Sequence, residues 1–145
     1  GMPASMVVGN KTFLGDWQRG TQSSTFQLNP LAASSSSYFI DLLIQGRLSA
    51  NVKECERHFE NILDPFKGFS IIKEVRGIGL FWGLEVNTSK IAKLVRRTAL
   101  SLGLLTWECG KNGNFIGLVP PLNVSKRDIS KAVNILNDAI CKNIE

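Results

Sequence analysis

The sequence predicts an α/β fold of the α+β two-layer kind, in which helices cover one side of a small sheet. The elements expected after residue 48 alternate as helix, strand pair, helix, strand, strand and helix, which is typical of a sheet with helices packed on it. Apolar residues recur at helical spacing over 52–63 and again over 129–140. The run over 69–87 is rich in β-branched and aromatic residues, as strands are.

The first part of the chain differs from the rest. "ASMVVGNK" (4–11) is a short apolar run that ends at Gly9-Asn10, which predicts a strand and a turn. The apolar residues of 13–29 follow neither helical nor strand spacing, which predicts a long loop. One strand, one loop and one helix cannot bury a core alone. We therefore expect 1–48 to be the end of a larger domain and 49–145 to be a small α/β domain.

A helix is expected over 30–45, although four consecutive serines inside it would also suit a flexible linker. Asn29 can cap its start, and Pro30 suits the first helical position, where its missing N–H costs nothing. Tyr38 and Leu42 then continue an apolar spacing of helical type, and Gly46 can close the helix. These signals favour the helix over the linker.

The elements expected after residue 48 follow from the spacing of apolar residues, from the glycines and prolines that end helices and strands, and from residues that can cap helices. In order they are a helix stopped at Asp64-Pro65, two strands or one bent strand over 69–87, a helix from Ser89 to Gly103, strands over 104–108 and 114–119, and a helix that starts at Ser125. The last helix has the clearest signal, because "SKRD" (125–128) is a capping box of the Ser-x-x-acid type.

The stretch "GNFIGLVPPLN" (113–123) raises a separate question. It predicts a buried strand that ends at Pro120-Pro121, because proline cannot donate to a sheet ladder. Gly117 stands at the centre of this strand, where glycine packs no side chain and costs backbone entropy. A β-bulge or a close-packing site would explain it structurally.

Composition excludes several classes of protein. The 145 residues are 43% hydrophobic with a net charge of +5, and no apolar run approaches the roughly 20 residues that span a bilayer. The basic cluster Lys90, Lys93, Arg96 and Arg97 lies on the polar side of a helix without interleaved aromatics, which favours a solvated face over a nucleic-acid site. We expect no membrane partner and no nucleic-acid partner.

Cysteine and histidine usage gives no metal site or disulfide framework. The three cysteines are far apart and outside CxxC spacing, so a reducing, cytoplasmic location is expected. The single histidine, His58, lies among charges and is expected on the surface rather than as a ligand. No catalytic constellation is visible, so no catalytic residue is assigned.

Two glycine-containing or hydroxyl-rich segments could hold an anion. "RGIGLFWG" (76–83) continues as a β-like run instead of opening a helix, which favours a bent or bulged strand over a phosphate loop. "GTQSSTF" (20–26) offers the hydroxyls of Ser24 and Thr25 shortly before a helix start, which suits a phosphate. Most loops of this composition bind nothing.

Three segments together resemble a known family. "GMPASMVVGN", then "GTQSSTFQLNPLAASSS", then "EVRGIGLFWGLEV" with "GLLTWECGKNGNFIGLVPPLNVS" stand in the order found in class-III pyridoxal-phosphate aminotransferases, such as those acting on 4-aminobutyrate, ornithine, acetylornithine and diaminobutyrate. The resemblance covers nearly the whole chain. It implies the C-terminal portion of a fold-type I enzyme: the end of the cofactor-binding large domain, then the small domain.

The resemblance also implies what an intact enzyme would contain. The family lysine that forms the Schiff base with pyridoxal 5'-phosphate lies upstream of the segment matching "GMP", and the aspartate that pairs with the pyridine nitrogen lies further upstream. Neither position is among these 145 residues, so we expect the chain alone to be inactive and to hold no cofactor tightly. Met2 suggests a truncated reading frame, a wrongly assigned start or a deliberately cut chain.

Two site positions can be transferred by resemblance. Thr25 matches the family threonine that contacts the cofactor phosphate from the neighbouring subunit, and Ser24 stands beside it. Gly117 stands where the family usually has an arginine that binds the substrate carboxylate. Either the parent enzyme holds its substrate differently, or substrate recognition is lost.

Two functions therefore stand as alternatives. The first is the C-terminal part of an aminotransferase, which in the intact enzyme moves an amino group from an amine or amino acid to a 2-oxo acid. The second is a non-catalytic interaction module that forms homodimers or self-associates through the former dimer and domain interface. The second function predicts a sizeable exposed apolar patch on 1–48, because that segment has lost its partners, and this patch should drive self-association.

Overall fold

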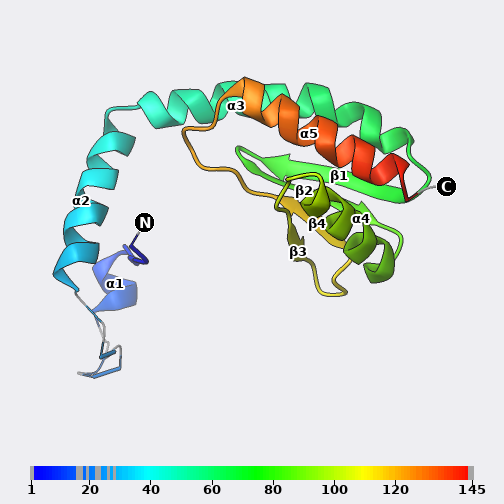
Figure 1. Ribbon diagram of the computed structural model, residues 1–145. Helices are drawn as coiled ribbons and strands as arrows, with labels where there is room; N and C mark the ends of the chain where they lie inside the picture. The colour runs from blue at the N-terminus through cyan, green and yellow to red at the C-terminus, as the bar shows by residue number, and fades with distance from the viewer. Residues whose placement is uncertain are drawn as a thin grey trace. The chain divides into compact units, whose positions relative to one another are not determined.

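The computed structural model describes residues 2–15, 18, 20, 21, 24, 25, 27 and 29–143. The chain divides into two compact units, residues 1–46 and 47–145 (Figure 1). The division lies close to the boundary expected after residue 48. That the two units are parts of a large and a small enzyme domain remains a prediction.

The described residues of the first unit form two helices, α1 (Lys11–Leu14) and α2 (Pro30–Ile44). The strand predicted over 4–11 is wrong: residues 2–10 have no regular structure, and Lys11 begins α1. An apolar run becomes a strand only where a neighbouring strand completes its hydrogen bonds, and the described part of this unit offers none. Asn10 instead caps the helix, accepting from the backbone N–H of Thr12 at 2.8 Å.

Helix α2 confirms the helix preferred over a flexible linker. The side-chain oxygen of Asn29 accepts from the backbone N–H groups of Leu31 at 2.9 Å and Ala32 at 3.3 Å. These bonds satisfy two of the donors that a helix start leaves free. Gly46 follows the helix with a φ of +76°, which glycine adopts at little cost.

The second unit is a two-layer α/β structure, which confirms the predicted class. Its antiparallel sheet has the order β1-β2-β4-β3. The strands are β1 (Ile72–Ile78), β2 (Phe81–Val86), β3 (Trp107–Cys109) and β4 (Phe115–Leu118). The helices are α3 (Arg47–Leu63), α4 (Ser89–Ser101) and α5 (Lys126–Cys141), with a short 3-10 helix over Asp64–Gly68 (Figure 1).

The core lies between the sheet and the three helices. Alternate residues of β2 and β4, such as Leu84 and Ile116, are fully buried and pack with Phe59 of α3 and Leu136 of α5. Helix α5 begins as predicted, because Ser125 Oγ accepts from the backbone N–H of Asp128 at 3.1 Å. The helical spacing of apolar residues predicted for α3 and α5 is confirmed, because residues at that spacing are the ones that these helices bury.

The glycine-rich segment forms a β-hairpin, which decides between the two strands and the one bent strand left open by the sequence. Gly79 turns the chain between β1 and β2 with a φ of +58°. Its backbone N–H donates to Glu56 at 2.6 Å, and its carbonyl accepts from Trp82 Nε1 at 2.9 Å. These glycines therefore lie in strands and in the turn between them and do not open a helix, which agrees with the β structure favoured for this segment.

The strand predicted over 104–108 is misplaced, since β3 covers only Trp107–Cys109. Gly103, with a φ of +91°, ends helix α4, and the backbone N–H of Leu104 still donates to the carbonyl of Ala99 at 2.8 Å. This residue therefore completes the helix end and is not free for the sheet. Pairing with β4 begins where Trp107 meets Gly117.

Within the described residues, none of the helices combines the length and the apolar character that crossing a membrane requires.

Candidate functional site

The predicted phosphate contacts, Ser24 and Thr25, lie in the first unit shortly before helix α2. Both side chains are exposed. The backbone N–H of Ser24 donates to Gln27 Oε1 at 3.4 Å, and the backbone N–H of Gln27 donates to the Ser24 carbonyl at 3.0 Å. Neighbouring Ser23, which the sequence places in the same hydroxyl-rich loop, lies outside the described residues. The geometry leaves both hydroxyls accessible to an anion.

The described residues do not by themselves fit a complete site for pyridoxal 5'-phosphate. A lysine that forms a Schiff base needs partial desolvation to act as a nucleophile, and every lysine of the chain is exposed. Lys11, which the sequence places in a turn, is the first residue of helix α1 instead. What remains for the cofactor is a pair of exposed hydroxyls, which could contribute donors to its phosphate.

Gly117 lies at the centre of β4, opposite Gly83 of β2 on one side and Trp107 of β3 on the other. A Cβ built on Gly117 would lie 3.3 Å from Cys109 Sγ and 3.4 Å from Trp107 Cβ. Such contacts are tighter than ordinary van der Waals packing. The close-packing interpretation of Gly117 therefore has direct support. Its role in substrate binding remains a prediction.

A cation reaches the same face of β4 from a different strand. Arg76 of β1 places its guanidinium 4.8 Å from the ring centroid of Phe115, two residues before Gly117. The same guanidinium lies 3.0 Å from Glu74, and both side chains are about half exposed, so this ion pair is weak. Sequence reasoning did not single out Arg76, because the register that brings β1 and β4 to either side of β2 is not a local property.

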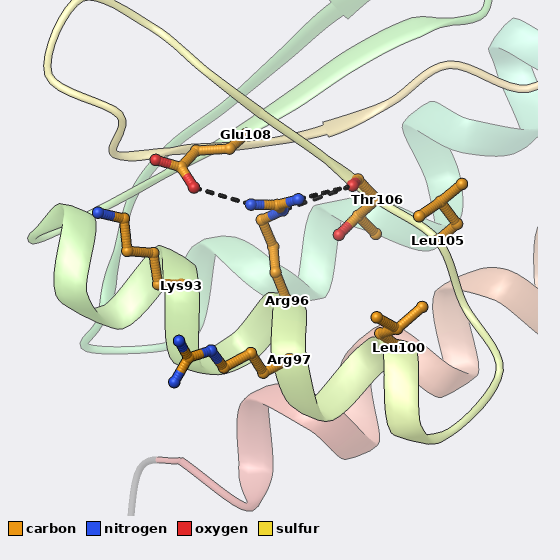
Figure 2. A pocket seen from close by; sticks show the side chains of 7 residues that line it. All are labelled: Lys93, Arg96, Arg97, Leu100, Leu105, Thr106 and Glu108. Atoms are coloured by element: carbon orange, nitrogen blue, oxygen red, sulfur yellow. Dashed lines mark hydrogen bonds and ion pairs between the residues drawn. The ribbon is translucent and has the colours of Figure 1, made fainter.

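A cavity with a volume of about 280 Å³ lies between α4 and β3. Its lining residues are Lys93, Arg96, Arg97, Leu100, Leu105, Thr106 and Glu108 (Figure 2). Helix α4 contributes the three basic residues. Helix α4 also contributes Leu100, the chain that leads into β3 contributes Leu105 and Thr106, and β3 contributes Glu108. We call this cavity the α4–β3 cleft.

Arg96 forms the fixed wall of the cleft. Its Nη1 atom lies 2.7 Å from Glu108 Oε2, and its Nε and Nη2 atoms each lie 3.4 Å from the carbonyl oxygen of Thr106 (Figure 2). The basic cluster was predicted to be a solvated face. That holds for the exposed Lys90, Lys93 and Arg97, but Arg96 is half-buried and paired.

Two side chains of α3, His58 and Cys55, pack against neighbouring parts of the second unit. His58 is half-buried instead of exposed, because its Nε2 atom lies 2.7 Å from Ser130 Oγ across the α3–α5 contact. Cys55 is buried, and this burial raises the pKa of its thiol above the usual range. Among the residues that the structure describes, no group of histidine, cysteine and acidic side chains could hold a metal ion.

Comparison with known sequences finds relatives that align with nearly the whole chain. The chain is 33% identical over 140 residues to an ornithine aminotransferase of Macrococcus caseolyticus, a match that covers 97% of this chain and 34% of that protein. It is 30% identical over 137 residues to a mitochondrial acetylornithine aminotransferase of Alnus glutinosa, covering 94% of this chain and 30% of the relative. The chain thus spans about a third of the length of these relatives.

Solved structures have the same fold. A transaminase from directed evolution by ancestral reconstruction superposes with a TM-score of 0.76 at 20% identity, over 92% of this chain and 31% of that one. An adenosylmethionine-8-amino-7-oxononanoate aminotransferase of Methanocaldococcus jannaschii gives a TM-score of 0.75 at 22% identity, over 93% of this chain and 32% of that one. Because the family model for class-III aminotransferases also matches residues 1–140, the chain belongs to the class-III aminotransferase family.

Proposed function

We propose that this chain is the C-terminal part of a pyridoxal-phosphate-dependent aminotransferase. In the intact enzyme, an amino group would move from an amine or amino acid to a 2-oxo acid. The match of the family to residues 1–140 is the observation that carries this proposal. The second unit would serve as the small domain, with its sheet face around Gly117 turned toward the substrate.

The proposed contribution of residues 1–46 is to the cofactor phosphate. Pyridoxal 5'-phosphate, when bound, supplies the electron sink for the reaction. The hydroxyl and backbone N–H of Thr25 would donate to a phosphate oxygen, in an active site formed by two subunits. The exposure of Ser24 and Thr25 supports this role, because a donor must be reachable by the partner subunit's cofactor.

We further propose that the 145 residues alone do not transaminate. The exposure of every lysine supports this, since none has the desolvated setting of a Schiff-base nucleophile. The chain by itself should give no amino transfer from ornithine to a 2-oxo acid in the presence of added pyridoxal phosphate. Turnover by the isolated chain would overturn this part of the proposal.

A chimera tests the function itself. The segment of the Macrococcus ornithine aminotransferase that aligns with this chain, 34% of its length and by this proposal its last third, would be replaced by the matching residues of this chain. We expect the chimera to bind pyridoxal phosphate and to transaminate an amine or amino acid, whereas the relative without its last third does neither. A chimera that folds and binds the cofactor but transfers no amino group from any donor would contradict the proposal.

Two variants of the same chimera separate the phosphate contacts. Thr25→Ala should weaken cofactor binding by about one to two orders of magnitude, since a hydrogen bond to a charged oxygen contributes about 1.5–3 kcal/mol. Thr25→Ser keeps the hydroxyl and is the matched control. Equal cofactor affinity in the Ala and Ser variants would remove Thr25 from the phosphate site.

Self-association is the second candidate function. Helix α2 buries none of its residues, and Leu31, Tyr38 and Ile44 are each about 67–77% exposed. Apolar side chains gathered on one exposed helix favour a partner surface, and we propose a second copy of this chain as the partner. Light scattering should show a concentration-dependent dimer that Tyr38→Lys weakens and that Ser37→Lys, on the same exposed helix, does not. A monomer at all concentrations would exclude it.

A further inference from the structure

We propose that the α4–β3 cleft binds a small phosphate monoester. This site does not depend on the aminotransferase assignment, since its residues belong to α4, β3 and the segment between them. Glu108 lies in the cleft, while its neighbours along β3 pair across from Gly117 and Phe115, which belong to the opposite face. The cleft is therefore on the helix side of the sheet, away from Gly117.

The charge of the cleft is the first observation. The three cations of α4 face a single carboxylate, Glu108, which is already taken by Arg96 at 2.7 Å. Lys93 and Arg97 have no ion-pair partner among the residues that the structure describes. They stand four residues apart on one helix, where like charges destabilise by a few tenths of a kcal/mol. Two uncompensated cations match a phosphate, whose charge near neutral pH is about −1.5 to −2.

The second observation is an unpaired hydroxyl. Thr106 is only 7% exposed, and its Oγ1 atom is buried with no hydrogen-bond partner. Figure 2 shows this hydroxyl on the side of Thr106 that faces α4 and its basic side chains. A buried unsatisfied hydroxyl costs about 1–3 kcal/mol, and valine would fill the same space without that cost. An oxygen of a ligand bound beside the α4 cations would accept a hydrogen bond from this hydroxyl.

The third observation is that the cleft has a fixed wall and a small volume. Arg96 is held by Glu108 and by the Thr106 carbonyl, so the wall beneath the ligand is fixed before binding. A volume of about 280 Å³ lies just below the range of about 300–1,000 Å³ for drug-sized ligands, so only a small ligand fits. Leu100 and Leu105 are exposed beside the cations and would contact the organic part of the ligand. A phosphate group on a short carbon skeleton fits these features together.

Binding is tested by titrating the ¹⁵N-labelled 145-residue chain with glycerol 3-phosphate, with inorganic phosphate and with neutral glycerol. We expect saturable amide shifts confined to α4 and to residues near Thr106 for both phosphates, tightest for the ester, and none for glycerol. The double variant Lys93→Gln, Arg97→Gln should weaken binding by at least about tenfold. The control Lys90→Gln, Lys111→Gln removes the same charge from exposed lysines outside the cleft and should change binding less than about twofold.

A second pair of variants tests the hydroxyl. Thr106→Val should weaken phosphate binding several-fold while the dispersed spectrum shows an intact fold, and Thr106→Ser should restore most of the affinity. Three results would overturn the proposal: no saturable shift at α4, equal weakening in the two double variants, or tight binding of an oligonucleotide with a steep salt dependence while glycerol 3-phosphate gives none. The last result would make α4 a nucleic-acid surface instead.

Discussion

Replacing Gly77 with alanine should destabilise the second unit, although β1 is an edge strand and Gly77 itself is exposed. A Cβ at this position would lie 2.6 Å from Trp82 Cγ and 2.7 Å from the Phe81 carbonyl oxygen. Real Cβ atoms do not approach other heavy atoms so closely. Either the indole of Trp82 must move, or the register between β1 and β2 must change.

The expected cost follows from what Trp82 does. Its side chain is 7% exposed, stacks on Phe59 with ring centroids 5.9 Å apart, and donates from Nε1 to the Gly79 carbonyl. Forcing an extra methyl group into a packed core costs about 1–3 kcal/mol, and loss of the aromatic pair adds about 0.5–1.5 kcal/mol. We expect a total loss of about 2–4 kcal/mol in the free energy of unfolding.

The assay is urea unfolding of the whole chain, followed by far-ultraviolet circular dichroism. Gly68→Ala is the matched control, because a Cβ at Gly68 meets no atom within 4 Å and its φ is not positive. That variant should stay within about 0.5 kcal/mol of the parent. The reasoning is refuted if Gly77→Ala is as stable as the parent, or if both glycine variants lose the same stability.

Three further predictions concern the helices and the cysteines. Ser125→Ala should lower the free energy of unfolding by about 1 kcal/mol, whereas Ser125→Asn, which can still cap α5, should lose only a few tenths; equal losses would contradict the capping role. The hydrogen bond and the charge of Lys126 lower the pKa of Glu54 in the folded chain. This pair therefore contributes fully to the free energy of unfolding above the unfolded pKa of about 4.3. Its contribution disappears as the pH falls through the lower pKa of the folded chain. Glu54→Gln should therefore be slightly less stable than the parent near neutral pH and equal to it in strong acid, and a difference that persists in acid would argue against the pair. In native protein, a thiol reagent should modify exposed Cys141 first and buried Cys55 last, because burial raises the pKa of Cys55 and blocks access; mass mapping that finds Cys55 modified first would oppose this.

Helices α2 to α5 could be predicted because the signals that mark a helix lie within short segments of the sequence. Asn29 and Ser125 accept from backbone donors only two or three residues away, so the caps are readable from short segments. The apolar spacing of α3 and α5 matches the faces that they bury. The family resemblance was readable for a similar reason, since it rests on short ordered motifs.

The errors occurred where a partner distant in sequence decides the structure. The apolar run over 4–11 has strand-like residues, but the described residues of its unit supply no neighbouring strand. The position of β3 depends on its pairing with β4 and on the end of α4, neither of which the segment 104–108 encodes alone. His58 looked like a surface residue because its partner, Ser130, is 72 positions away.

The sequence by itself determined the class of fold, the caps of α2 and α5, and the family, because these depend on composition, on the spacing of apolar residues and on short motifs. Only the tertiary structure decided which side chains meet: the register that sets Gly117 between Gly83 and Trp107, and the cleft that joins α4 to Thr106. Strand register and helix docking are chosen by the summed packing of residues far apart in the chain. A one-residue slip along a strand would turn every side chain to the other face, and no local pattern records which register wins.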